Sequence, residues 1–279
     1  MSLDNERAIS LYQSIKDSNE RRVYEHWHAS SISDCPRAHY YKRLGIEPLR
    51  KPSAAMVIRW ESGHAIEKTI RQHIENVYGK TVSNVRMTDK ELDLTGEFDN
   101  MVIANNRLVE IKSVHDLAFI EREGKLSLKE KTGTAMRAGR EINTWGIKDT
   151  PYLHHELQNH AYVLLLSKNN ITTKNIDYVY ISLSGRIVVY TTDVQQELLD
   201  NVIKRLSILN EAWNSKELPP CICNDTNHPL YDGVMSYCDY QDPNGGECCS
   251  PQLQYQQTTI LDNKIKEKSN GKKDIYKTI

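Results

Sequence analysis

Alternating apolar and polar residues predict two β-hairpins in the middle of the chain. Their four strands are rich in β-branched and aromatic residues, and Asn, Ser and Gly fill the short connections. The first hairpin is expected to pair residues 94–103 with 108–112, and the second residues 177–182 with 186–190. Each strand has one apolar side, so both hairpins should pack on a core.

Apolar residues spaced three or four apart predict helices elsewhere. We expect them over residues 1–28, 29–45, 60–78, 151–166 and 194–213. Gly45 should end the second helix, Thr192-Asp193 should cap the last, and Pro219-Pro220 should stop it. The helix over 60–78 should face the core with Ile66, Ile70, Ile74 and Val77.

Residues 116–151 are polar, are interrupted by glycines and fit no single element. The segment is locally rich in cations, namely Arg122, Lys125, Lys129, Lys131, Arg137, Arg140 and Lys148. Two interpretations stay open: a solvated excursion, or a flexible wall of a groove that binds a nucleic-acid strand.

Three charged residues of the first hairpin are candidates for chemistry. Side chains two apart in a strand point the same way, so Glu110 and Lys112 should project together. Asp99, on the partner strand, can reach the same edge. Two carboxylates and an ammonium make a site for a hard divalent cation beside a phosphate. Taken alone, a Glu-x-Lys pattern usually marks a solvated strand face, so the case rests on the other residues along the chain.

Composition bounds the possible partners. The 279 residues are 26% charged, with a formal net charge of −1, so nucleic-acid affinity would need a local groove. The sequence contains no run of about 18 apolar residues, so we expect no membrane span. The first residues lack a signal peptide's apolar core, so we expect a cytoplasmic protein, or one in a host's cytoplasm if phage-encoded.

The six cysteines then suggest metal ligands or thiols rather than disulfides. Five of them fall within about thirty polar residues near the C-terminus, where a metal would help to fix a shape; these are Cys221, Cys223, Cys238, Cys248 and Cys249. The sixth, Cys35, lies in the first turn of a predicted helix. Structural zinc is the simplest metal that such a group of cysteines would bind.

Taken in order, these segments resemble the RecB-like branch of the PD-(D/E)XK nuclease superfamily. The likeness is strongest to iron–sulfur exonucleases that include CRISPR-associated members and phage-encoded relatives. It spans about residues 29–250, and its matching segments are 31–41 around Cys35, Gly63–Glu67, Gly96–Asp99, Val109–Lys112 and Gln158–Tyr162.

The resemblance implies a role for each matching residue. His64, Asp99, Glu110 and the backbone carbonyl of Ile111 would bind Mg²⁺ or Mn²⁺, and a neutral His64 would favour Mn²⁺. Lys112 would orient the attacking water and offset charge in the transition state. The remaining pair, Gln158 and Tyr162, would position the DNA strand.

The same resemblance implies a 4Fe-4S cluster held by one early and three late cysteines. The late spacing departs from the family, in which these cysteines are compact, so five compete for three places. We expect Cys35, Cys223, Cys238 and Cys248 as ligands, with Cys221 and Cys249 as substitutes and zinc as the alternative metal.

The expected fold is α/β and restriction-endonuclease-like, with a central mixed sheet flanked by helices. We divide the chain into an N-terminal helical region (1–58), a nuclease core (59–215), a Cys-rich segment (216–250) and a polar tail (251–279). The expected function is a metal-dependent exonuclease acting on single-stranded DNA or DNA ends. The alternatives are a zinc-stapled structure-specific endonuclease, or a non-catalytic DNA-binding subunit with a recombination or CRISPR-adaptation partner.

Overall fold

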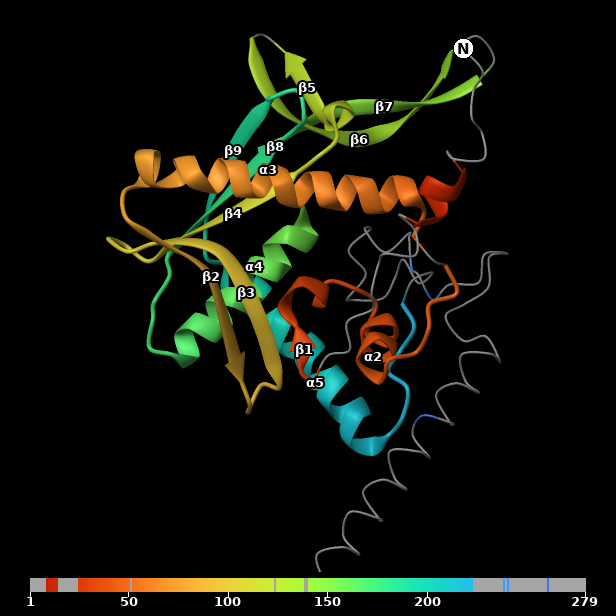
Figure 1. Cartoon of the computed structure of the whole chain (residues 1–279), viewed down its shortest axis with the longest axis vertical. Coiled ribbons are helices and arrows are strands. Elements are labelled where there is room, and N and C mark those ends of the chain that lie inside the picture. The colour runs from red at the N-terminus through yellow and green to blue at the C-terminus, as the bar shows by residue number, and fades with distance from the viewer. Residues whose placement is uncertain are drawn as a thin grey trace, which may run out of the picture.

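The computed structural model describes residues 9–14, 25–50, 52–122, 124–137, 140–222 and the single positions 238, 240 and 260. A six-stranded mixed sheet forms its centre (Figure 1). The strands are β1 (Trp27–His28), β2 (Thr81–Asp89), β3 (Leu94–Val102), β4 (Arg107–Ser113), β8 (Asn175–Ile181) and β9 (Ile187–Asp193). Both predicted hairpins, β3–β4 and β8–β9, are confirmed.

Strand β3 is paired along both edges. On one edge, β2 runs antiparallel to it from Leu94 to Val102. The other edge is shared, because β1 pairs in parallel with residues 94–95 and β4 pairs antiparallel with residues 100–102. Residues 96–99 therefore face a gap between β1 and β4. Beyond it, β4 pairs in parallel with β8, which continues the sheet to β9.

Helices cover the two faces of this sheet. Helix α3 (Ala54–Tyr78) crosses the front of the molecule in Figure 1 and packs on a small apolar cluster that includes Val109 and Ile111. The other face carries α4 (Leu153–Lys168) and α5 (Gln196–Ser215), with α2 (Pro36–Leu44) packed against α5. Mixed α/β architecture with a central sheet flanked by helices is thus confirmed.

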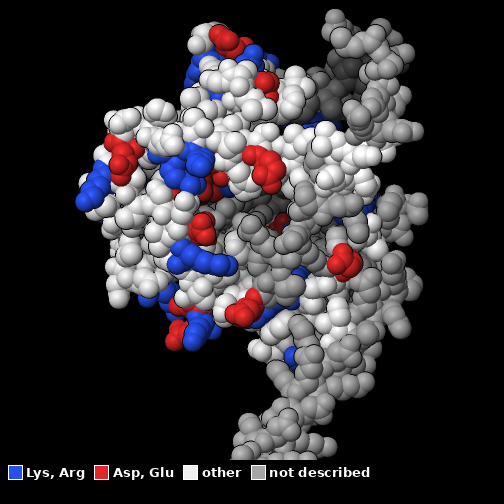
Figure 2. Space-filling view, in the orientation of Figure 1, with Lys and Arg blue, Asp and Glu red and all other residues white. Residues whose placement is uncertain are grey.

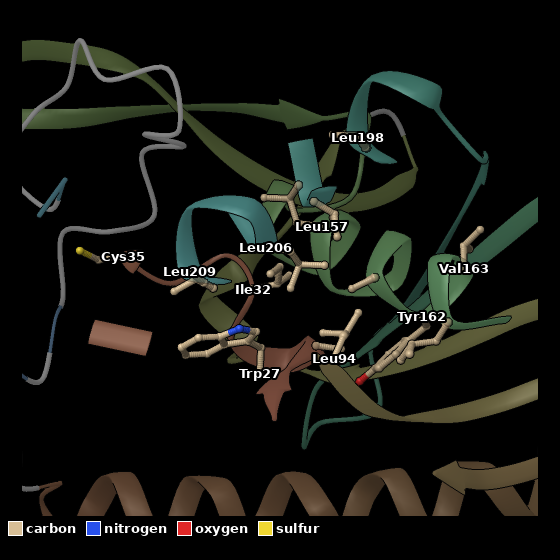
Figure 3. Close-up of a cluster of buried hydrophobic side chains, with 14 of the residues drawn as sticks. Trp27, Ile32, Cys35, Leu94, Leu157, Tyr162, Val163, Leu198, Leu206 and Leu209 are labelled. Atoms are coloured by element: carbon tan, nitrogen blue, oxygen red, sulfur yellow. The ribbon is translucent and has the colours of Figure 1, made fainter. Parts of the chain in front are cut away.

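The larger cluster of buried side chains lies among β3, α4 and α5 (Figure 3). Trp27 is fully buried there, and its indole Nε1 donates to Oδ1 of Asn210 at 2.6 Å. The Arg43 guanidinium lies between the rings of Trp27 and Trp213, 4.3 and 4.1 Å from their centroids. This cluster joins β1 and α2 to α5.

Some helix predictions need correction. Helix α3 begins at Ala54, before the expected start, because the Ser53 hydroxyl accepts the N–H of Met56 as an N-cap. Its expected core residue Val77 is 78% exposed, and this end of the helix reaches the core cluster through Ile74 and Tyr78 instead. Thr192 and Asp193 belong to β9, so the N-cap of α5 is Gln195.

The N-terminal prediction fits only in part. Residues 9–14 are helical, but Ile9, Leu11 and Tyr12 are exposed rather than forming a buried stripe. Further on, Trp27–His28 is a short strand, followed by a 3-10 turn over Ala29–Ser31. The predicted end of α2 at Gly45 is confirmed, because its φ of 79° is the left-handed conformation that glycine favours.

The polar segment 116–151 is ordered as a second sheet. It contains β5 (Phe119–Arg122), β6 (Lys125–Arg137) and β7 (Arg140–Lys148), all antiparallel, after a 3-10 turn over Asp116–Ala118. A bulge between Lys131 and Gly133 shifts the register and breaks the period-2 pattern. The segment is therefore regular secondary structure, and both interpretations, a solvated excursion and a wall of a strand-binding groove, stay open. No helix in the described part of the chain is long and apolar enough to cross a membrane.

Four histidines are held neutral by their surroundings. Burial lowers the pKa of His39 to about 3 and that of His154 to about 4. It also lowers the pKa of His155 and of His160. His160 is structural, since its Nδ1 lies 2.7 Å from the Glu156 carbonyl and its Nε2 accepts the N–H of Gln195.

These histidines should make the fold acid-sensitive. In the unfolded chain they take up protons below a pKa of about 6.5, whereas in the folded protein they do not until much lower pH, so stability is lost as pH falls. Burial raises the carboxyl pKa values of Glu67, Glu110 and Glu156, so the folded protein binds protons there more readily than the unfolded chain does. This opposes the loss of stability, but the four histidines outnumber the three carboxyls. We expect the free energy of unfolding of the metal-free protein to fall between pH 6 and pH 5. Urea unfolding at pH 7, 6 and 5 measures this, and a level or rising value would contradict it.

Candidate active site

The gap beside β3 lets the Asp99 carboxylate, one of the predicted metal ligands, reach β4. The β3–β4 ladder ends at the pair Asn100–Val109, after which the strands diverge. The Asp99 side chain enters the divergence, and its Oδ2 accepts the N–H of Ile111 at 2.9 Å. Asp99 thus replaces a missing ladder bond and stands beside the Glu110–Lys112 strand.

Glu110 and Lys112 project together, as the strand pattern predicts. The Glu110 side chain is 2% exposed, and Lys112 Nζ lies 2.6 Å from its Oε1. Between them, the Ile111 side chain points to the other face and is buried in the cluster under α3. This alternation places two charged groups against α4 and the apolar groups against α3.

Helix α4 supplies the predicted amide and phenol. Gln158 Nε2 donates to Oε1 of Glu110 at 3.0 Å and lies 2.7 Å from the hydroxyl of Tyr162. The two residues are one helical turn apart and therefore share a face. Four of the predicted site residues are linked in this way: Tyr162 to Gln158, Gln158 to Glu110, and Glu110 to Lys112.

Gly96 lets Tyr162 lie against β3. A Cβ atom at Gly96 would stand 2.7 Å from Cε1 of Tyr162 and 2.8 Å from Cβ of Ala29. Both distances are too short for carbon atoms, so glycine is required where the ring crosses the strand. The resemblance placed Gly96 in the aspartate segment, and its structural role is to admit the aromatic ring.

A methyl group at Gly96 should therefore displace Tyr162. We expect Gly96→Ala to destabilise the fold by about 1–3 kcal/mol through overpacking. The matched control is Gly63→Ala, where the added carbon is too close only to the Ser113 hydroxyl oxygen, which can rotate away. In that helix, alanine should be neutral or slightly stabilising. Urea midpoints of the two variants measure the difference, and equal midpoints would disprove the role of Gly96.

Helix α3 adds charged groups that the sequence reasoning did not assign. Arg71 Nη2 lies 3.7 Å from Oδ1 of Asp99. Glu67 lies one turn earlier, and its Oε2 is 3.8 Å from Nδ1 of His64. The three residues are spaced three and four apart on one side of α3, which is the signal that could have found them. The His64 side chain is 74% exposed and contacts Glu67 rather than Asp99 or Glu110.

Crowding of carboxylates sets the electrostatics of the site. Burial, followed by the charge of Asp99, raises the pKa of Glu110 to about 8. Burial and Asp99 also raise the pKa of Glu67. Burial acts to lower the pKa of Lys112, but Glu110, Asp99 and Glu67 outweigh it and raise this pKa. The ammonium is therefore held charged among acids that repel one another, an arrangement that a cation would stabilise.

Hard oxygen donors are the chemistry this site offers to a metal. Asp99, Glu110 and Glu67 supply carboxylates of the kind that Mg²⁺ and Mn²⁺ prefer. Within the part of the chain that the structure describes, no three His, Cys, Asp or Glu residues are already grouped as a ready cation site. The carboxylates bond instead to Ile111, Lys112, Gln158 and Arg71.

Three of the six cysteines lie among the described residues. Cys35 is buried at the N-cap of α2, and its Sγ accepts the N–H of Ile222 at 3.5 Å. Figure 3 shows Cys35 at the margin of the main cluster, to which buried Cys238 and half-buried Cys221 also belong. Tyr240 follows Cys238, and its hydroxyl donates to the carbonyl of Ile46. The other predicted or substitute ligands, Cys223, Cys248 and Cys249, lie outside the described residues.

Comparison with known proteins gives similarities in structure only. No family model and no curated protein matches the chain. Its structure is similar to the crystal structure of SSO0001, with 14% identity, 86% of this chain and 95% of that chain covered, and a TM-score of 0.44. It is also similar to LHK-Exo, an alkaline exonuclease from Laribacter hongkongensis, with 10% identity, 73% and 93% covered, and a TM-score of 0.45. For LHK-Exo in complex with dAMP the identity is 11%, the coverage 75% and 93%, and the TM-score 0.44. At these values the similarities assign the chain to no family.

Proposed function

We propose that this protein is a divalent-metal-dependent nuclease that hydrolyses phosphodiester bonds of DNA. The observation that carries the proposal is the meeting of Asp99, Glu110 and Lys112 where β4 leaves β3. An ordinary solvated strand face would expose these groups, whereas Glu110 is almost fully buried. Burying a carboxylate and an ammonium is costly, so their retention favours a chemical role over a structural one.

The carboxylates of Asp99 and Glu110 would hold Mg²⁺ or Mn²⁺, together with the backbone carbonyl of Ile111. Glu67 or His64 would complete the protein's share of the ligands from α3. When bound, the ion supplies polarisation of the phosphate and a lower pKa for a coordinated water. Its charge would also favour ionised Glu110, which reverses the effect of burial on that carboxyl pKa.

The chain's own groups perform the remaining tasks. Lys112 Nζ orients the attacking water and offsets the negative charge that develops on the phosphate. Gln158 fixes Glu110 through its amide and contacts the Tyr162 hydroxyl. Helix α4 would thus hold the carboxylate in place, and Gln158 and Tyr162 would position the DNA strand. Because these groups are held before the substrate arrives, little reorganisation is needed during reaction.

We further propose that the substrate is single-stranded DNA or a DNA end, and that a 4Fe-4S cluster joins the two ends of the fold. The position of Cys35 supports the cluster, since its sulfur already contacts the backbone that leads into the Cys-rich segment. Buried Cys238 belongs to the same apolar cluster and supports it further. A thiolate here would accept the Ile222 N–H, as sulfur ligands of such clusters commonly do.

Release of nucleotides from labelled DNA tests the proposed activity. With Mn²⁺, linear single-stranded DNA should yield acid-soluble nucleotides, and EDTA should stop the reaction. Circular single-stranded DNA should stay intact, because an exonuclease needs an end. Cleavage of the circle would make the enzyme an endonuclease, and no release under any metal would disprove the proposed function.

A further inference from the structure

The second sheet is inserted between the two parts of the candidate site. Its first strand, β5, follows the strand of Glu110 and Lys112 after the short link 114–118, and β7 leads into α4 after 149–152. The Tyr190 hydroxyl fixes the base by accepting the N–H of Leu128 and donating to the carbonyl of Lys148. Lys148 Nζ lies 5.8 Å from the ring centroid of Tyr152, whose N–H donates to the Tyr180 hydroxyl. Tyr180 is the β8 partner of Lys112, so the base of the sheet lies beside the site.

Strand alternation separates the charges of this sheet onto two faces. The pairs Lys125–Arg122 and Lys131–Trp145 lie on the same face as Lys129, because cross-strand partners and residues two apart share a side. We call this the cationic face, made of Arg122, Lys125, Lys129 and Lys131. The opposite face packs Phe119 and Leu128 into the main core and carries the acids Glu121 and Glu130. Among the side chains that the structure describes in this sheet, none on the cationic face is acidic.

One aromatic side chain lies within the cationic face. Trp145 is 42% exposed, and Lys129 Nζ stands 4.9 Å from its ring centroid. Arg122 Nη2 donates to the Trp145 carbonyl at 2.9 Å, so the β5–β6 hairpin folds over towards β7. Lys125 and Lys131 form no ion pair with any residue within the described ranges. Figure 2 shows Lys and Arg gathered with acidic groups at the top of the molecule, where this sheet lies.

We propose that the cationic face and Trp145 form a binding platform for a single strand of DNA outside the active site. The cations match the phosphate backbone, and an exposed indole offers a stacking surface that only unpaired bases can use. The inference rests on the proposed nuclease function, and it makes single-stranded DNA the preferred substrate. A DNA duplex could contact the cationic side chains, but its paired bases could not stack on the Trp145 ring, so it should bind more weakly.

Charge reversal at two positions tests the platform without disturbing its internal contacts. The variant K125E/K131E keeps the contacts of Arg122 and Lys129 with Trp145. With a fluorescent 20-nucleotide oligo-dT, Ca²⁺ and fluorescence anisotropy, we expect at least tenfold weaker binding. The slope of log affinity against log salt should fall by about 1.4, or about 0.7 per lost phosphate contact. The matched control K174E/K204E reverses two exposed lysines outside this sheet and should bind like wild type.

Substitution of the indole tests stacking separately. W145A should weaken binding of oligo-dT by about 5- to 150-fold, and W145F should keep most of the affinity. Wild-type affinity in both K125E/K131E and W145A would overturn the platform. Equal losses in the K174E/K204E control would also overturn it, since they would indicate a general charge effect.

A small substrate separates this inference from the proposed function. Bis(p-nitrophenyl) phosphate reaches the active site without the platform, so K125E/K131E should hydrolyse it with Mn²⁺ at the wild-type rate while its KM for oligo-dT rises. Wild-type hydrolysis of the small diester with unchanged oligo-dT binding in the variants would overturn the platform alone. No hydrolysis by wild type, with binding lost in the variants, would overturn the nuclease and leave the platform.

Discussion

Lys112→Ala should abolish detectable Mn²⁺-dependent hydrolysis of single-stranded DNA, a loss of at least about 10²- to 10³-fold. The ammonium is the cation closest to Glu110, and its removal leaves no charged donor for the water and the phosphate at that position. Glu110→Gln should have an equally large effect, because an amide is a poor ligand for a hard cation. Single-turnover assays at saturating Mn²⁺ measure both losses.

The folded state should survive both substitutions. Glu110 can remain protonated once its partner is gone, since burial already raises its pKa to about 8. A glutamine at this position keeps the size of the side chain and removes the cost of a buried charge. Thermal unfolding and oligo-dT binding in Ca²⁺ should therefore stay near the wild-type values. The matched control is Lys80→Ala, an exposed lysine before β2. Undiminished hydrolysis by both Lys112→Ala and Glu110→Gln would show that the β3–β4 gap is not the active site.

Cys35→Ser should remove bound iron and lower the melting temperature by roughly 10 °C. Cys35 is 3% exposed and stands where α2 begins, in contact with residues 220 and 222. A metal bound at this sulfur would tie the start of the core to the segment after α5, and its binding free energy would add to folding stability. Serine fills the space but is a poor ligand for iron.

Metal analysis of protein purified without oxygen measures this. Wild type should be brown and hold roughly four irons per chain, and Cys35→Ser should be colourless. Cys221→Ser separates the expected ligands from the substitutes, because it should keep its iron if Cys223, Cys238 and Cys248 are the late ligands. Zinc in place of iron would replace the cluster with a zinc site, and a colourless wild type with neither metal would refute both.

The sequence patterns located the parts of the fold that follow a regular period. Both hairpins of the central sheet and the α4 helix were predictable, because their apolar residues recur at two or at three and four positions. The shared faces of Glu110 with Lys112 and of Gln158 with Tyr162 followed from the same periods, whereas the meeting of these two pairs was implied only by the family resemblance. The second sheet was missed because its strands are polar on one face and glycine-rich, and because the bulge at Lys131 breaks the alternation.

Other features depend on contacts that no local pattern contains. The pairing of Asp99 with the Ile111 N–H arises from the divergence of β3 and β4. The approach of Arg71 to Asp99 depends on how α3 crosses the sheet. Likewise, Gly96 in a strand could have marked a bulge, a bend or a close approach, and only the position of Tyr162 decides among them.

The parallel pairing of β4 with β8 has a consequence for how the protein folds. It joins Leu108 to Ile176, so the second sheet and α4 must be enclosed in one long loop before the strand of Glu110 is paired on its second edge. Contacts so distant along the chain form slowly, so we expect the β4–β8 pairing to come late in folding. The entropy of loop closure grows only logarithmically, by about 0.6 kcal/mol per doubling of length, so a sheet of this size can be inserted or shortened there at little thermodynamic cost.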